Sequence, residues 1–404
     1  MLTDVAEIEK TVRSRSADAF AGIRVIDVDT HLTEPFDLWT SRAPAAWRDR
    51  VPQVHDHDGV PTWFLDGRPF GLAQPAACIL PDGSKHYGAS FMGLRYDDVH
   101  RGAHSVAPRL EVMDRSGIYA QIVYPNLLGF GNTKASDYDP DLRMITTTIY
   151  NDAMAELQEE SGGRLLPMAL LPWWDIDATV AEAERAKAMG LRGIITNADP
   201  QDAGMPDLGE RFWDPLWEAC ASLSLPVNFH IGGSQTQRTW FGSTPWPSQA
   251  DDQKLAIGGA MMFFSNARIL TNLLFSGVCE RFPTVQLVSV ESGIGWIPYL
   301  LENLDYQIEE LAPASVSYLS MKPSEYFRRQ MHACFWFEHG DIANTIAQLG
   351  DDNVMFETDF PHPTCLYGDT LDRVATALGA LPETTRRKIL STNAARLYNI
   401  PLDA

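Results

Sequence analysis

The chain has 404 residues, of which 45% are hydrophobic, so it can bury a large core and is not a disordered protein. Its formal net charge of −21 makes nucleic acid and anionic membranes poor partners for the surface as a whole. Five scattered cysteines without a C-x-x-C pair, and an N-terminal segment without an apolar signal region, predict a protein of the reducing cytoplasm.

Short apolar runs alternate with longer segments of helical periodicity, a pattern typical of repeated βα units around a parallel sheet. Eight strands are predicted, at residues 24–29, 119–124, 165–170, 193–196, 227–230, 285–291, 332–337 and 354–358. Helices are predicted at residues 139–160, 177–189, 212–223, 253–279, 294–310 and 342–349. Eight repeats, with no glycine-rich dinucleotide-binding motif after the first strand, favour a closed (β/α)₈ TIM barrel over an open sheet.

A long insertion, about residues 32–109, separates the first two predicted strands. Three Asp-Gly pairs predict hairpin turns within it, at residues 58–59, 66–67 and 82–83. Long loops in compact domains usually have a function, and aromatic residues such as Trp63 and Phe64 provide an apolar face. We therefore expect one metalloenzyme domain over residues 1–404, with this insertion forming a β-rich cap over the barrel mouth.

Polar side chains stand where the predicted strands end, which is where functional groups gather in a parallel barrel. The first strand ends I-D-V-D-T-H, and its alternation places Asp27, Asp29 and His31 on one side. Later positions add Glu34, His230, Glu291, Asp359 and His362. Buried carboxylates need compensation, and a divalent cation provides it most directly, so we predict a metal site. The predicted ligands are Asp29, His31, Glu34, His230, Glu291, Asp359 and His362. A hydrogen-bonded polar core is the alternative at each position, and it is the favoured one for Asp27.

Three motifs resemble those of the amidohydrolase-related barrels that include aminocarboxymuconate-semialdehyde decarboxylase. They are D-x-D-T-H-x-x-E-P at the first strand, F-H-I-G-G at the fifth and T-D-F-P-H at the eighth. The resemblance extends over residues 25–400. It implies that His31, His230 and Asp359 match metal ligands, and that Asp29 replaces the first histidine of the usual H-x-H pair.

At the end of the sixth strand those decarboxylases have a catalytic histidine, whereas this chain has Glu291 in V-E-S-G. In this respect the chain resembles the branch that contains the non-heme diiron monooxygenase of platensimycin and platencin biosynthesis. The resemblance implies that two iron ions activate O₂, and it makes a coenzyme A thioester one candidate for the substrate. The phosphates of such a substrate would need cations, for which the candidates are Arg95, Arg101, Arg109, Lys134 and Arg238.

The donor set of four carboxylates and two or three imidazoles agrees with two iron ions. Our leading hypothesis is a diiron monooxygenase that hydroxylates a hydrophobic substrate, with a terpenoid among the candidates and with Glu291 and His362 as catalytic residues. The alternative is a mononuclear zinc or manganese hydrolase or decarboxylase, in which Glu291 or Asp359 is the general base. A barrel that has lost activity and only binds a ligand is a third option. The oligomeric state is open, with a homodimer among the options.

Overall fold

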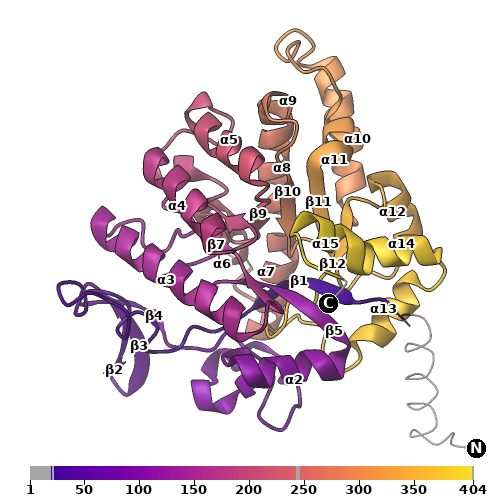
Figure 1. The fold of residues 1–404 in the computed structure, drawn as a ribbon. Coiled ribbons are helices and arrows are strands. Elements are labelled where there is room, and N and C mark those ends of the chain that lie inside the picture. Colours follow the sequence, from indigo (N-terminus) through magenta and orange to yellow (C-terminus); the bar gives the residue numbers. More distant parts are fainter. Residues whose placement is uncertain (1–19, 21, 243–245, 403–404) are drawn as a thin grey trace, which may run out of the picture.

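The computed structural model describes residues 20, 22–242 and 246–402. Parallel strands form a barrel with helices packed around it (Figure 1), and the predicted TIM-barrel fold is confirmed. The barrel strands are β1 (Val25–His31), β5 (Ile118–Tyr124), β6 (Leu165–Pro167), β7 (Ala169–Leu170), β8 (Ile194–Ile195), β9 (Val227–His230), β10 (Leu287–Val290), β11 (Met331–Phe335) and β12 (Val354–Phe356). The segments β6 and β7 follow one another as two halves of one strand.

The last strand returns to the first and closes the barrel. Thr30 and Phe360 form a parallel bridge, and the backbone N–H of His31 donates to the carbonyl of Phe360 at 2.8 Å. The backbone N–H of Asp359 donates to the carbonyl of Asp29 at 2.9 Å. The ends of the first and eighth barrel strands, which carry predicted metal ligands, are therefore hydrogen-bonded to each other.

Apart from Tyr119 of β5, the residues of the barrel strands are buried, as expected for strands covered by helices on one side and by other strands on the other. Helices α3 (Pro140–Glu160), α4 (Ile176–Ala188), α5 (Asp214–Leu223), α10 (Ile297–Glu310) and α12 (Ile342–Leu349) lie where helices were predicted. Asp139 caps the start of α3 by accepting from the N–H of Asp141, and Pro140 suits the first turn.

One helix prediction was wrong in its extent. The segment 253–279 forms three helices, α7 (Asp251–Phe263), α8 (Asn266–Phe275) and α9 (Val278–Arg281). Gly277 has φ +79° between the last two, a conformation that ends a helix. The other helices are α2 (Val106–Ser116), α6 (Gln235–Gly242), α11 (Pro323–Gln330), α13 (Thr370–Leu378), α14 (Glu383–Arg387) and α15 (Asn393–Leu397). None of the helices in the described ranges is long and apolar enough to cross a membrane.

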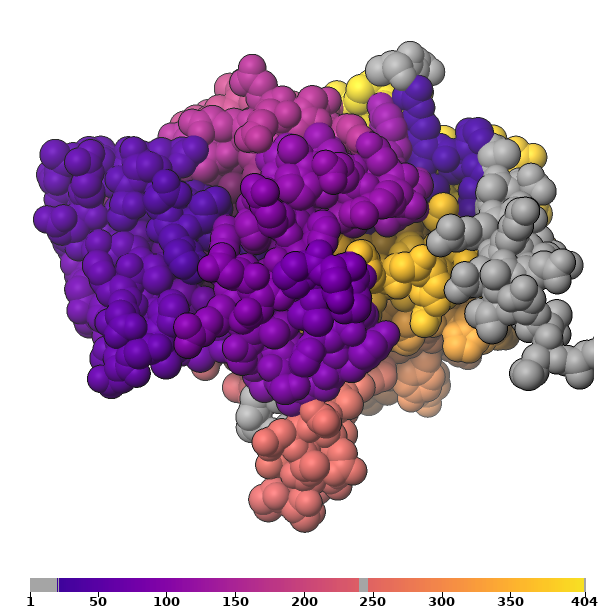
Figure 2. All heavy atoms as spheres, turned by 90° about the horizontal axis from the view of Figure 1, so that it is seen from below, coloured from indigo at the N-terminus to yellow at the C-terminus, as the bar shows by residue number. Residues whose placement is uncertain are grey.

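The first part of the insertion forms an antiparallel sheet of β2 (Gln53–His57), β3 (Val60–Leu65) and β4 (Arg68–Leu72). The first two Asp-Gly pairs turn between its strands, as predicted, and both residues of each pair have positive φ. The sheet lies beside the start of α3, where Arg50 pairs with Asp139 at 3.0 Å. It forms part of the indigo lobe at one side of the molecule in Figure 2.

The later part of the insertion, residues 73–105, instead approaches the end of the eighth strand. The backbone N–H of Cys78 donates to the carbonyl of Pro361 at 3.0 Å, and Lys85 Nζ donates to the carbonyl of Cys365 at 2.6 Å. This later part of the insertion therefore contacts the segment that carries Asp359 and His362. The domain boundaries given above stay a prediction.

Candidate metal centre

Five of the predicted ligands come from the ends of four strands. Asp29 and His31 lie at the end of β1, and His230 is the last residue of β9. Glu291 follows β10 directly, and Asp359 stands three residues after β12. Glu291 and Asp359 have φ values of +54° and +61°, a left-handed conformation that side chains other than glycine rarely adopt. Backbone strain of this kind is typical of functional sites.

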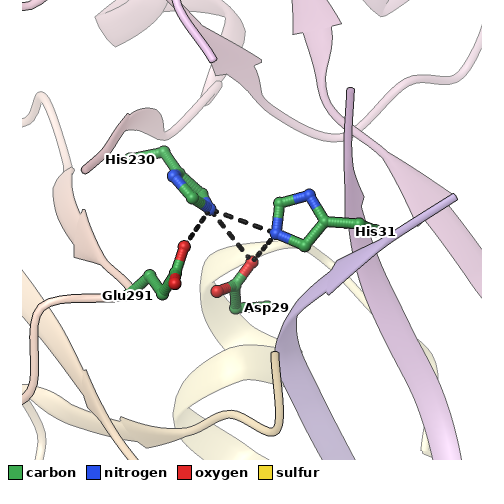
Figure 3. A group of neighbouring side chains, drawn as sticks. All are labelled: Asp29, His31, His230 and Glu291. Carbon is green, nitrogen blue, oxygen red and sulfur yellow. Dashed lines mark hydrogen bonds and ion pairs between the residues drawn. The ribbon is translucent and has the colours of Figure 1, made fainter. Parts of the chain in front are cut away.

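The side chains of Asp29, His31, His230 and Glu291 point toward one another (Figure 3), and all four residues are buried. One ligand atom from each of Asp29, His31, His230 and Glu291 lies within 4.8 Å of every other one. His230 Nε2 is 3.1 Å from Glu291 Oε2 and 3.5 Å from Asp29 Oδ1. A second group, sharing His31 and Glu291 with the first, adds Asp359 and His362 within the same limit.

The imidazole rings of His31 and His230 face each other through the same atom, Nε2. His230 Nδ1 lies 2.8 Å from the carbonyl oxygen of Ile231, to which it can only donate, so Nε2 keeps its lone pair. His230 Nε2 is 3.3 Å from His31 Nε2. Burial lowers the pKa of His230 to about 3, and it lowers the pKa of His31 well below its usual value, so both rings are neutral. Two neutral imidazoles facing each other are arranged for a shared cation.

Asp29 lacks the donors that a buried carboxylate needs. Neither of its oxygens accepts a hydrogen bond from any described residue, and its side chain is fully buried. Burial, and then the charge of Asp359, raise the pKa of Asp29 well above its ordinary value. A divalent cation would offset both the cost of burying the Asp29 carboxylate and its repulsion by Asp359. A ligand set of carboxylate oxygens and imidazole nitrogens suits manganese or zinc. The residues at this site therefore fit a divalent metal ion.

His362 lies at the edge of the cluster. Its ring stacks on that of His31 with centroids 3.7 Å apart, and its Nδ1 is 2.9 Å from Asp359 Oδ1. Its Nε2 is 3.1 Å from Asn126 Oδ1, in the loop after β5. Its neighbours thus fix the ring orientation from both sides.

The structure does not bring Glu34 into either group. Glu34 Oε1 accepts from the backbone N–H groups of Asn126 and Leu127 at 2.8 and 3.0 Å. Its carboxylate therefore holds the loop after β5 at the barrel mouth. This loop also carries Phe130, whose ring lies over that of His230 with centroids 3.9 Å apart.

Asp27 is also outside the cluster. Thr358 donates to it through its backbone N–H at 2.8 Å and through its hydroxyl at 2.6 Å, and Gln121 Nε2 donates at 3.0 Å. These bonds attach β1 to the chain just after β12 and to β5. Burial still outweighs them and raises the pKa of Asp27 to about 7.

Several residues of the site were not predicted from the sequence. Glu357 is fully buried, and its Oε2 accepts from the backbone N–H of Glu291 at 3.2 Å. It stands two positions before Asp359, as Asp27 stands before Asp29, and this spacing was a signal that could have been used. Asn126 and Phe130 gave no signal, because their roles depend on how the loop folds over the site.

Arg109, one of the residues predicted to bind phosphate groups, is unable to contact a phosphate. The side chain of Arg109 is fully buried, donates to the carbonyl of His31, and lies 4.4 Å from the centroid of the Phe360 ring. It packs against the two joined strand ends and is not exposed to solvent. Lys134 and Arg238 are nearer the mouth, where Arg238 donates to Thr133 Oγ1 at 2.6 Å.

Comparison with known proteins places the chain in a family. The model of the amidohydrolase family Amidohydro_2 matches residues 26–400, so the chain belongs to this family. A γ-resorcylate decarboxylase of Rhizobium sp. is 26% identical over 314 residues, which are 72% of this chain and 86% of that enzyme.

Solved structures agree in fold. An amidohydrolase of Mycobacterium avium subsp. paratuberculosis superimposes with a TM-score of 0.72 at 23% identity, covering 93% of this chain and 99% of that one. A dihydroxybenzoic acid decarboxylase of Polaromonas sp., solved with manganese and the inhibitor 2-nitroresorcinol, gives a TM-score of 0.60 at 17% identity. That comparison covers 93% of this chain and 97% of the Polaromonas chain.

These findings correct the functional prediction. The diiron monooxygenase was wrong, because the relative matched over most of its length is a decarboxylase and the Polaromonas neighbour carries manganese. The two side-chain groups share His31 and Glu291 and so describe one centre, not separate sites for two iron ions. The count of four carboxylates had included Glu34, whose Oε1 is bound to two backbone amides. Nothing found supports O₂ or a coenzyme A thioester as a partner.

Proposed function

We propose that this chain is a metal-dependent decarboxylase that acts on a small aromatic carboxylic acid. The observation that carries the proposal is the buried carboxylate of Asp29, without a hydrogen-bond donor, beside two neutral imidazoles and two further carboxylates. The γ-resorcylate decarboxylase relative supports the reaction class, and the manganese and 2-nitroresorcinol of the Polaromonas structure support the metal and the substrate class.

In this proposal Asp29, His31, His230 and Asp359 would hold one manganese or zinc ion. Bound there, the ion would act as a Lewis acid that polarises an oxygen of the substrate. Asn126 and Asp359 orient His362, whose ring lies flat against that of His31. Phe130 covers the imidazole of His230, which keeps water away from that side of the site.

Glu291 is our candidate for the proton transfer. Decarboxylation of an arene breaks the bond to the carboxyl carbon, releases CO₂ and requires one proton at the ring carbon left behind. Burial, and then the charges of Asp359 and Asp29, raise the pKa of Glu291 well above its ordinary value. A carboxyl group that keeps its proton near neutral pH can deliver it from Oε2 to the ring carbon.

A hydrolytic reaction is the second candidate, and Glu291 is the observation that favours it. The resemblance places a histidine at this position in the decarboxylases, whereas a carboxylate can serve as the general base that deprotonates a water molecule. In that case an ester or amide of an aromatic acid would be cleaved, and no CO₂ would be released.

The test uses the full chain, stripped of metal with a chelator and reloaded with one equivalent of Mn²⁺ or Zn²⁺. γ-Resorcylate and related hydroxybenzoates are supplied with and without air, and CO₂ release is measured beside oxygen uptake. We expect metal-dependent CO₂ release that is the same without air, and inhibition by 2-nitroresorcinol. Metal-dependent cleavage of phenyl esters without CO₂ release would favour the hydrolase. Full activity after complete metal removal would overturn both.

A further inference from the structure

Two cysteines from distant parts of the chain meet behind the metal centre. Cys78 belongs to the later part of the insertion, and Cys365 to the loop after β12 that also carries His362. Cys78 Sγ donates to the carbonyl oxygen of His362 at 3.2 Å, and the backbone N–H of Cys365 donates to the same oxygen at 3.1 Å. The two side chains also interact, because each thiol shifts the pKa of the other. The sulfur of Cys78 and the backbone N–H of Cys365 therefore meet at one carbonyl oxygen, which makes the two cysteines neighbours.

The surroundings hold this pair in place. Cys78 and Cys365 lie in a small buried cluster with Ile79, Val112 and Phe360, separate from the main core of the barrel. The backbone of Cys78 is fixed by its bond to Pro361, and that of Cys365 by the bond from Lys85 Nζ.

The remaining cysteines provide a built-in contrast. Cys220, Cys279 and Cys334 belong to the main core, and none of them is hydrogen-bonded to another thiol among the described residues. Burial raises the pKa of both Cys220 and Cys279 to about 12, which keeps them as unreactive thiols. The hydrogen bond from Cys365 instead lowers the pKa of Cys78, although burial opposes the shift.

We propose that Cys78 and Cys365 form a reversible disulfide when the protein meets a hydroperoxide, and that this bond controls the metal centre. The sulfur of Cys78 attacks the O–O bond of hydrogen peroxide, becomes a sulfenic acid and releases one water molecule. The thiol of Cys365 then attacks that sulfur, the S–S bond forms, and the second water molecule leaves. The two thiols lose two electrons in total, and the peroxide takes them up.

The effect reaches the metal centre through His362. In the reduced protein the thiol of Cys78 donates to the carbonyl of His362, and the disulfide has no hydrogen left for this bond. The new covalent bond also ties the insertion to the loop between Asp359 and Cys365. Because His362 stacks on His31 and contacts Asp359, the oxidised protein binds Mn²⁺ about tenfold more weakly.

Peptide mapping tests the bond directly and does not depend on which reaction the enzyme catalyses. The full-length protein is treated with a few equivalents of hydrogen peroxide, alkylated and digested without reductant. We expect a cross-linked peptide that contains Cys78 and Cys365 and disappears after dithiothreitol, while Cys220 and Cys279 stay alkylated as thiols. The absence of this peptide, or further oxidation of either residue to sulfinic acid in its place, would overturn the proposal.

Two variants complete the test. Cys365→Ser removes the second thiol, so Cys78 accumulates as a sulfenic acid that dimedone traps. Cys78→Ser removes the cross-link but keeps a hydroxyl that can donate to His362, so its Mn²⁺ affinity stays at the reduced wild-type value with or without peroxide. A cross-link that leaves the Mn²⁺ affinity of the wild type unchanged would overturn the control of the metal centre.

Discussion

Asp27 and Asp29 stand two residues apart on the same strand, both fully buried, yet their surroundings are opposite. Asp27 accepts hydrogen bonds from Thr358 and Gln121, which join β1 to its neighbours. Asp29 accepts none from the described residues and faces two imidazoles and two carboxylates. Burial alone therefore does not distinguish a structural carboxylate from a metal ligand. What distinguishes them is whether the protein itself supplies the donors.

The largest effect that tests this contrast concerns Asp29. Replacing it by Asn, a substitution of nearly the same shape, removes a charged ligand from the centre. We expect Asp29→Asn to weaken Mn²⁺ binding by about 1000-fold, equivalent to about 4 kcal/mol, and to abolish metal-dependent turnover. Calorimetric titration of the metal-free protein measures the affinity. Unchanged Mn²⁺ affinity in this variant would show that Asp29 is not a ligand.

The pH dependence of metal binding gives the second largest effect. Burial raises the pKa of Asp29, so this carboxyl keeps its proton in the metal-free protein. A carboxyl whose pKa is raised on folding has no effect on stability below its ordinary pKa of about 4, and destabilises the folded state increasingly as pH rises toward the raised value. A bound ion must displace this proton. His31 and His230 are already neutral and release none.

We therefore expect Mn²⁺ affinity to rise by about tenfold per pH unit while one proton is displaced. Titrations from pH 5 to 8 in buffers of different ionisation enthalpy count the protons released. The metal-free protein should meanwhile lose stability over the same range, measured by thermal unfolding. An affinity that does not change with pH would contradict the assignment of Asp29 as a ligand.

Asp27 provides the matched comparison, with the opposite sign in the metal-free protein. Asp27→Asn replaces one acceptor oxygen by an NH₂ group that faces donors, so we expect it to lower the free energy of unfolding by about 2 kcal/mol. Asp29→Asn replaces a buried carboxyl to which no described residue donates a hydrogen bond, so the metal-free form should be as stable as the wild type or more stable. Urea unfolding of both variants without metal makes the comparison. If the two substitutions lowered the free energy of unfolding equally, Asp27 and Asp29 would not differ in their structural roles.

The sequence was sufficient to predict the barrel and the convergence of polar strand ends. The strands are continuous apolar runs, and their polar residues fall at the ends, where parallel strands share one rim. Sequence could not separate Glu34 from Asp359, because both follow a strand and only the path of the loop after β5 shows that Glu34 binds backbone amides. Counting Glu34 as a ligand then supported the two iron ions that the resemblance had implied. The meeting of Cys78 with Cys365 was equally invisible, since it depends on where the insertion touches the last strand.

The smallest expected effect comes from substituting Asn126, at the edge of the metal centre. Its side chain is the partner of His362 Nε2, while Asp359 holds the opposite nitrogen. Asn126→Ala leaves Nε2 without this partner and frees the ring to rotate, so we expect about a tenfold loss in kcat. The backbone N–H of residue 126 still binds Glu34, so the loop keeps its position and the KM for substrate changes little. Asn126→Asp keeps an acceptor and should restore most of the rate, whereas equal losses in both variants would show that the loop, and not the ring of His362, carries the effect.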